Sequence, residues 1–192
     1  MKTIEIQGTK RNSLTKQSVK ALRNDEQVPC VLYGGDAEPL HFSATLAAFK
    51  PLVYTPDVHL VKLVVDGQER KCILQDIQFH PVTDVIQHID FLAVSDDKPV
   101  TIHIPIRLSG ASEGVKQGGK LVTKVRKLKV KAMPAQLPDT INIDITSLKI
   151  GGDIRVRDLS ADGVTFLDAP SNVVVGVRTT RNVVAAEGAD KK

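Results

Sequence analysis

Residues 87–91, which read Gln-His-Ile-Asp-Phe, carry the side chains best suited to chemistry. Side chains alternate between the two faces of an extended strand, so His88 and Asp90 project together while Ile89 and Phe91 lie on the opposite face. An imidazole beside a carboxylate can transfer a proton, or it can exchange hydrogen bonds with a ligand. The spacing therefore predicts a polar pair displayed on a rigid strand.

An active site is the weaker interpretation of this pair. A catalytic pair also needs a nucleophile or a metal and a substrate pocket, and no serine elbow, phosphate loop or ligand cluster accompanies it. The five histidines are dispersed, and Cys30 and Cys72 lie far apart in apolar runs. We expect buried free thiols, no enzymatic activity, no small-molecule substrate, and no cofactor or metal bound by the protein. An enzyme would be distinguished by a closed pocket beside His88 and Asp90, rather than an open convex face.

A surface that binds RNA is the stronger interpretation. Asp90 can accept a hydrogen bond from a base or ribose donor, and His88 and Gln75 can donate or accept beside it. Because a carboxylate repels phosphates, its presence favours specific recognition over general attraction. Tyr33 and Gly34 end an apolar run, where a ring can meet a ribose or base and a glycine lets backbone approach closely. The alternative is a half-buried strand end followed by a turn.

Three cations precede this run at helical spacing. Lys16, Lys20 and Arg23 are four and three residues apart, which places them on one face of a short helix. They could contact phosphates, or they could form the solvated face of an amphipathic helix whose Val19 and Leu22 pack inward.

The composition is that of a globular chain with two local basic segments. Of 192 residues, 42% are hydrophobic and 25% are charged, and the net charge is +4. No apolar run could span a bilayer, and residues 1–7 show strand-like alternation rather than a signal peptide, so we expect a cytoplasmic protein without a membrane partner. Residues 1–23 hold six Lys or Arg against one acid, and residues 116–131 hold seven and none. Either segment could neutralise phosphates.

A charged, proline-ended step at residues 95–99 divides the chain. We expect a first domain at 1–94, a second at 95–182 and a flexible tail at 183–192. The first domain is predicted to be a barrel-like α+β fold. Its strands are expected at 2–8, 29–33, 40–43, 58–65, 69–79 and 85–93, and its helices at 14–25 and at 45–54, the latter cut by Pro51.

The second domain is predicted to be an all-β sandwich or barrel. Period-two alternation over 100–108 is typical of a half-buried strand, and turn signals separate the runs that follow. The further strands are expected at 121–132, 141–145, 153–157, 164–167 and 172–179. A glycine pair at 118–119 within the basic segment is weak evidence for a phosphate cradle, since the spacing and hydroxyl of a nucleotide-binding loop are missing.

Several separated blocks of residues resemble the bacterial large-subunit ribosomal protein L twenty-five family. They are Arg11, Lys16, Lys20, the pair 22–23, Pro29, the run 33–35, the run 75–78, the pair 80–81 and the run 87–91. The glycine-containing runs 114–121 and 150–154 resemble the extra domain of its long form, the general stress protein CTC. The resemblance covers nearly the whole chain.

The resemblance implies a structural, non-enzymatic protein of the large ribosomal subunit that binds loop E of 5S ribosomal RNA. Arg11, Lys16 and Arg23 match positions that touch the RNA backbone, and Tyr33 matches an RNA-contacting position. Magnesium bound to the RNA is a candidate companion, and 23S ribosomal RNA and neighbouring ribosomal proteins are candidate further partners. A basic hairpin against other ribosomal RNA and a soluble rim are equal interpretations of the second basic segment. Its candidate contacts are Lys116, Lys120, Lys124, Arg126 and Lys127.

The chain departs from the family pattern in the first helix. The family usually has glycine at the position of Thr15 and often a further arginine where Ala21 or Asn24 stands, so this helix is expected to make fewer charged contacts. These departures keep open a different class of function, a stress-related adaptor that binds another protein and has weakened RNA binding.

Overall fold

The computed structural model describes residues 2–35, 38–95, 97–161 and 163–180. They form two compact units, the first ending at Val100 and the second holding most of the chain from Thr101. The predicted tail at 183–192 lies outside the described residues. No helix in the described part of the chain is long and apolar enough to cross a bilayer.

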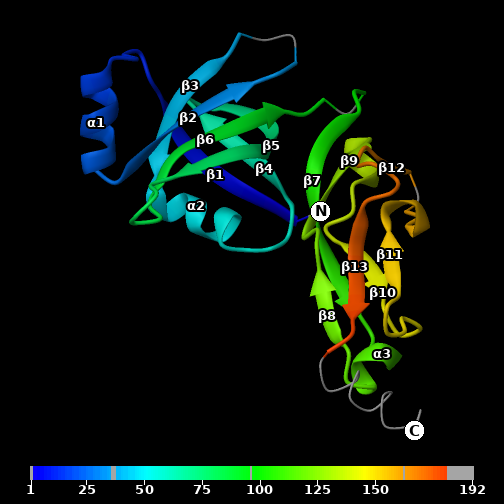
Figure 1. Ribbon diagram of the computed structural model, residues 1–192. Helices are drawn as coiled ribbons and strands as arrows, with labels where there is room; N and C mark the ends of the chain where they lie inside the picture. The colour runs from blue at the N-terminus through cyan, green and yellow to red at the C-terminus, as the bar shows by residue number, and fades with distance from the viewer. Residues whose placement is uncertain (1, 36–37, 96, 162, 181–192) are drawn as a thin grey trace, which may run out of the picture. The chain divides into compact units, whose positions relative to one another are not determined.

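The first unit is a closed six-stranded barrel, as Figure 1 shows. Around the barrel the order is β1-β3-β2-β6-β5-β4, which confirms the barrel-like prediction. Neighbours pair antiparallel except for β1 with β4 and β2 with β6, which are parallel. The strands are β1 (Lys2–Lys10), β2 (Gln27–Tyr33), β3 (Leu40–Thr45), β4 (His59–Val65), β5 (Gln68–Phe79) and β6 (Ile86–Ala93).

Strand alternation fills the barrel interior with apolar side chains. In β4 every second residue is buried, and β6 turns Ile89 and Phe91 inward at 0% exposure. The Phe91 ring lies 5.8 Å from that of Phe42 and 6.2 Å from that of Phe49. Such tilted aromatic contacts add to the stabilisation from burial. The β6 side chains between these anchors therefore point outward from a rigid wall.

Both cysteines lie in this interior as free thiols. Burial raises the pKa of Cys72 to about 12, and burial raises the pKa of Cys30 still further. The thiols are therefore protonated core residues at neutral pH.

Two helices accompany the barrel. Helix α1 (Lys16–Asn24) stands beside β2, and α2 (Leu46–Val53) directs Phe49 and Leu52 into the core. The expectation that Pro51 cuts the second helix is wrong, because α2 continues to Val53. Pro51 lies near the C-terminal end of the helix, where its missing N–H removes a single helical hydrogen bond and the buried neighbours hold the last turn in place.

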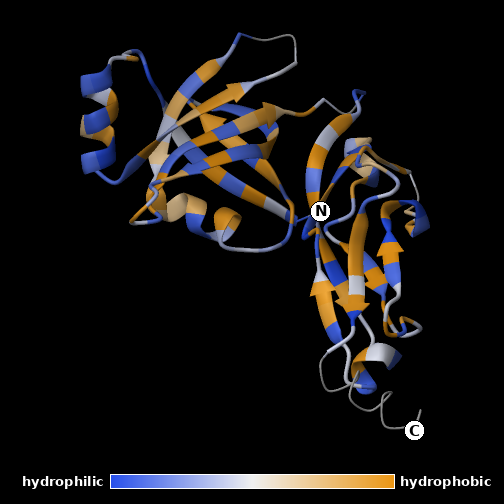
Figure 2. Cartoon of the chain, in the orientation of Figure 1, coloured by the Kyte–Doolittle hydropathy of each residue, from blue (hydrophilic) through white to orange (hydrophobic). Residues whose placement is uncertain are grey.

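The second unit contains two sheets. The four-stranded sheet has the order β10-β7-β9-β12, and the three-stranded sheet has the order β11-β13-β8. In Figure 2 blue segments interrupt the orange along most of these strands, as expected for strands with one buried face, whereas β13 is almost wholly orange because most of its residues are buried. The prediction of a mainly β second domain is confirmed. Its strands are β7 (Val100–Ser109), β8 (Lys120–Thr123), β9 (Lys127–Ala132), β10 (Ile141–Asp144), β11 (Asp153–Arg155), β12 (Val164–Phe166) and β13 (Val173–Arg178).

The single strand expected over 121–132 is wrong. The chain leaves the three-stranded sheet after β8 and joins the four-stranded sheet at β9. At the corner, the backbone N–H groups of Lys124 and Val125 both donate to the carbonyl of Val174. A strand that switches sheets bends in this way. Short helical segments not expected from the sequence also occur, namely α3 (Glu113–Lys116), η1 (Pro134–Gln136) and η2 (Val156–Asp158).

Candidate nucleic-acid interface

The outward faces of four neighbouring barrel strands present one row of side chains. Strand register places His41 of β3 opposite Val31 of β2, Val31 opposite Asp90 of β6, and Asp90 opposite Asp76 of β5. Each of these four side chains is half-buried or exposed, whereas their chain neighbours Phe91 and Leu32 fill the interior. The row runs across a convex wall, so it can meet an extended partner rather than enclose a small molecule.

His88 and Asp90 form the expected pair on this wall. Nδ1 of His88 lies 2.7 Å from Oδ1 of Asp90, and each side chain is 28% exposed. The contact is not aligned with a ring N–H, so it is a close polar contact rather than a straight hydrogen bond. Strand register puts His88 opposite Gln78, which extends the polar surface to β5. The pair therefore places an imidazole and a carboxylate side by side on the outward face of β6.

Tyr33 ends β2 beside the two carboxylates. Partial burial of its hydroxyl and the negative charges of Asp90 and Asp76 raise the pKa of Tyr33 above its ordinary value. The hydroxyl therefore keeps its proton at physiological pH and can donate to a ribose or base acceptor.

Gly34 has a structural reason for its place after Tyr33. Its φ of +95° is in the region that favours glycine, and an added Cβ would lie 2.7 Å from Cδ1 of Leu92. The turn and the contact with Leu92 account for this glycine, and they fix the end of β2 that carries Tyr33.

Gln75 lies at a β-bulge. Leu74 pairs with Phe91 and Asp76 pairs with Asp90, so Gln75 is an extra residue on β5. Its side chain is exposed, next in the chain to the Asp76 side chain that faces Asp90. Bulges of this kind re-aim side chains and are common next to functional sites.

Helix α1 is held weakly to the barrel. None of its nine residues is buried, Val19 and Leu22 are half-buried, and Leu14 just before it is 58% exposed. An isolated helix of this length is marginal in water, so a partner that covers α1 would stabilise it. Lys16 and Lys20 are exposed on its surface, four residues apart.

Thr15 is the N-cap of α1. Its Oγ1 accepts a hydrogen bond from the backbone N–H of Ser18 at 3.4 Å, and its carbonyl accepts from the Ser18 hydroxyl at 2.8 Å. Threonine is a preferred N-cap residue, so it supports a helix that has little other anchoring.

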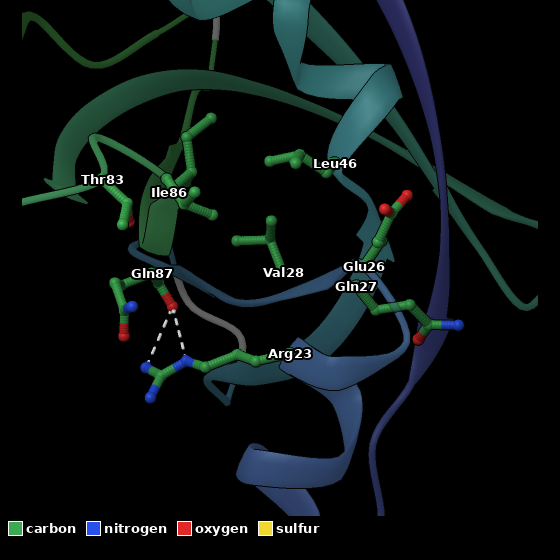
Figure 3. Close-up of a pocket in the computed structure, with 9 residues that line it drawn as sticks. Arg23, Glu26, Gln27, Val28, Leu46, Thr83, Ile86 and Gln87 are labelled. Atoms are coloured by element: carbon green, nitrogen blue, oxygen red, sulfur yellow. Dashed lines mark hydrogen bonds between the residues drawn. The ribbon is translucent and has the colours of Figure 1, made fainter. Parts of the chain in front are cut away.

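Arg23 anchors the end of α1 to the barrel. Its Nε and Nη2 donate to the carbonyl of Gln87 at 3.3 and 3.0 Å, as the dashed lines in Figure 3 show. These atoms border a half-open groove of about 210 Å³ that is also lined by Glu26, Val28 and Leu46. Two of the donors of Arg23 are therefore already used inside the protein, which leaves the remaining N–H groups for an external contact.

Arg11 lies where β1 leaves the barrel toward α1. Its backbone N–H donates to the carbonyl of His41 at 2.9 Å, and Nη2 donates to the carbonyl of Ser13 at 3.3 Å. Its Nε is buried without a hydrogen-bond partner. Arg11 therefore connects the row of strand residues to the α1 segment.

His80 holds the β5–β6 loop rather than joining the polar wall. Its Nδ1 accepts from the backbone N–H groups of Val82 and Thr83 at 3.4 and 3.2 Å. This fixed loop presents Val82 at 84% exposure.

The structure divides the second basic segment between two sheets. Lys116 ends α3, and Lys120 and Lys124 lie on or just after β8. Arg126 directly precedes β9, and Lys127 is its first residue. The glycines between them are required by packing. A Cβ on Gly119 would lie 2.5 Å from Cγ1 of Val177 and 2.7 Å from the carbonyl oxygen of Gly114. This close approach explains Gly119, and a φ of +91° explains Gly118, without a phosphate.

The outward faces of β2, β5 and β6, which we call the polar wall, therefore bring together Tyr33, His88 and Asp90, with Gln75 beside them. The three cations of the first basic segment lie on the separate α1, namely Lys16, Lys20 and Arg23. Sequence reasoning missed His41 and Asp76 as members of the row. Strand alternation could have flagged Asp76, but only the pairing of β5 with β6 shows that it faces Asp90. Within the described residues, no group of three or more His, Cys, Asp or Glu side chains is arranged to hold a metal.

Comparisons with known proteins match both units. The family model described as the ribosomal L25p family matches residues 6–91, and the one described as ribosomal protein TL5, C-terminal domain, matches residues 99–181. A relative from Amoebophilus asiaticus is 50% identical with all of both chains covered. One from Christiangramia forsetii is 49% identical over 97% of this chain and 86% of its own. One from Porphyromonas gingivalis is 46% identical, covering 100% of this chain and 99% of its own. Each of these relatives is named large ribosomal subunit protein bL25.

Proposed function

Since this chain belongs to the ribosomal L25p family, we propose that its barrel binds 5S ribosomal RNA. The coarser function is that of a structural, non-enzymatic protein of the large ribosomal subunit, working on the ribosome in the bacterial cytoplasm. The choice of 5S RNA rests on the resemblance of residues 11–35 and 75–91 to the family's RNA-contacting blocks.

The observation that carries the proposal is the row of polar side chains around Asp90. Tyr33, His88 and Asp90 present a donor, an imidazole and a charged acceptor on neighbouring strands, with Asp76 across from Asp90. Two carboxylates on one wall weaken a general attraction for phosphates. They suit a site that accepts hydrogen bonds from base N–H groups or ribose 2′-hydroxyls, as in the wide minor groove of RNA.

Cations at the edge of this wall supply the phosphate contacts. Lys16 and Lys20 are exposed on α1, and Arg11 lies between α1 and the strands. Phosphate contacts of this kind orient a protein on RNA, while the base and ribose contacts select the site. Arg23 keeps α1 in place through Gln87 and contributes its remaining N–H groups.

We assign the two roles to the ranges 1–94 and 95–182. The first range binds 5S RNA, and the second braces 23S ribosomal RNA or neighbouring ribosomal proteins. The exposed cations of the second range, Lys116, Lys120, Lys124, Arg126 and Lys127, are its candidate contacts.

The alternative function, a stress-related adaptor with weakened RNA binding, makes a different prediction for the protein purified from its own cells. We expect the full-length chain, tagged and recovered at low salt, to carry RNA that absorbs at 260 nm and runs as 5S RNA on a denaturing gel. Recovery of a protein partner without RNA would instead support the adaptor.

A further inference from the structure

Strand β9 carries a row of three exposed lysines on one face. Lys127, Lys129 and Lys131 are exposed, whereas Leu128 and Val130 between them are 0% exposed. Alternate residues of a strand lie on one face about 6.6–6.8 Å apart. The three ammonium groups therefore emerge from one face at regular spacing. We call these three residues the lysine ladder.

The ladder is built on a fixed support. β9 lies between β7 and β12 in the four-stranded sheet, with Thr165 opposite Lys131 and Phe166 opposite Val130. The backbone N–H of Lys129 donates to Asp168 at 2.7 Å. A central strand keeps its side-chain directions, so the row persists without a partner.

The outward face around the ladder is mainly basic. Within the described residues, none of the three lysines forms an ion pair. Alternation puts His103 and Arg107 of β7 on the same face as exposed side chains, and Arg126 directly precedes the ladder. Two carboxylates lie on or beside this sheet and keep their negative charge, Asp168, which accepts from the backbone N–H of Lys129, and Asp144 on β10, which accepts from that of Thr146. They offset the positive charge only in part.

The chemistry of this face favours a polyanion over an acidic protein or a single strand. Lysine is depleted in protein interfaces, because its strongly hydrated ammonium is costly to bury. Single-stranded RNA is usually held by stacking on large aromatic rings, but Phe166 is the only Phe, Tyr or Trp after position 100 and it pairs with the inward-facing Val130. Evenly spaced ammonium charges, without a Phe, Tyr or Trp side chain among them, fit the phosphates of a double helix.

We propose that the lysine ladder is a docking surface for the phosphate backbone of double-helical RNA, bound without sequence preference. This inference deepens the bracing role of the second range and rests on that part of the proposed function. The proposed RNA contact is then one face of the four-stranded sheet, rather than the whole basic segment 116–131. Lys116, Lys120 and Lys124, on α3 and at β8, are not part of this face.

A matched pair of triple variants of the full-length chain tests the ladder. The first changes Lys127, Lys129 and Lys131 to alanine, and the control changes Lys116, Lys120 and Lys124 to alanine. Both remove three exposed charges. The probe is an RNA duplex of unrelated sequence, titrated over a range of salt concentrations. We expect the ladder variant to lower the salt slope by up to about 2.7, using the B-DNA value per contact, and the control to lower it less.

The outcomes separate this inference from the binding of 5S RNA. Equal losses in the two variants, or an unchanged slope in the ladder variant, would overturn the ladder. A ladder variant that binds the duplex normally but is lost from large ribosomal subunits would also overturn it, and would identify a protein partner. The preference for 5S RNA over transfer RNA is measured in parallel and should be the same in wild type and ladder variant. If the wild-type chain shows no preference for 5S RNA, the 5S proposal is refuted. The comparison of the two triple variants on the RNA duplex would still test the ladder.

Discussion

Replacing Asp90 with alanine tests whether this carboxylate contributes to the recognition of RNA or is only a surface charge that repels phosphates. The side chain is 28% exposed and lies 2.7 Å from His88 and opposite Asp76. If Asp90 accepts a hydrogen bond from a base or ribose donor, the alanine variant leaves that donor unpaired. The usual penalty is about 1–3 kcal/mol, which corresponds to roughly 5- to 150-fold weaker binding.

The structure also predicts the effect of this change on folding. Like charges directly opposite each other on neighbouring strands are destabilising, by roughly 0.2–1 kcal/mol. Removing Asp90 relieves its repulsion with Asp76 but also removes its contact with His88, so the two effects oppose each other and the free energy of unfolding should change by less than about 1 kcal/mol. A loss of RNA binding could then not be attributed to unfolding.

The assay is a titration of 5S RNA and of 5S RNA with an altered loop E, in magnesium. Asp90→Ala should weaken binding to the natural loop and leave binding to the altered RNA level or tighter. The matched control is Glu5→Ala, because Glu5 is an exposed carboxylate on β1, the barrel strand opposite β6. Parallel losses on both RNAs would refute the recognition role, and tighter binding of natural 5S RNA by Asp90→Asn would show that Asp90 only repels.

Three further predictions follow from the structure of the first unit. Lys16→Ala or Lys20→Ala should lower the salt slope of 5S binding by about 0.7–0.9, whereas an unchanged slope would mean that the lysine faces solvent in the complex. Arg23→Ala should chiefly loosen α1, lowering the free energy of unfolding in urea by about 1 kcal/mol because two hydrogen bonds to Gln87 are lost. A lower salt slope at unchanged stability would instead make Arg23 mainly a phosphate contact. Burial keeps Cys30 and Cys72 protonated when folded, whereas unfolded thiols ionise from their ordinary pKa of 9.0 upward. Stability should therefore be retained below about pH 8 and fall by about 1.4 kcal/mol per thiol between pH 8 and 10, and Cys30→Ala should make this fall shallower.

The sequence predicts the barrel strands well because their alternation is regular and their ends carry turn residues. The strands expected at 58–65 and 69–79 correspond to β4 and β5, joined at Asp66 and Gly67, which both have positive φ. The outward direction of His88 and Asp90 follows from the same alternation. These features depend on near neighbours in the chain, so local patterns suffice to find them.

Features that depend on pairing between distant strands escape such reasoning. The parallel pairing of β2 with β6 brings Tyr33 near Asp90, and the bulge at Gln75 sets which β5 residue faces it. The break between β8 and β9 has no glycine or proline to mark it, since residues 124–126 read Lys-Val-Arg. Likewise, the helical spacing of Arg23 gives no sign that its side chain is held by Gln87, 64 residues away.

The most direct test of the central claim is the affinity of the full-length chain for 5S RNA compared with transfer RNA of similar size. Both RNAs offer phosphates to the exposed cations Lys16 and Lys20, but only one offers the loop that the wall around Asp90 is proposed to recognise. Both RNAs are titrated at the same salt and magnesium concentrations. The Asp90 contact alone is expected to contribute roughly 5- to 150-fold, so 5S RNA should bind more tightly than transfer RNA by about that factor or more. Equal affinity for the two RNAs would contradict the claim that this barrel recognises 5S RNA.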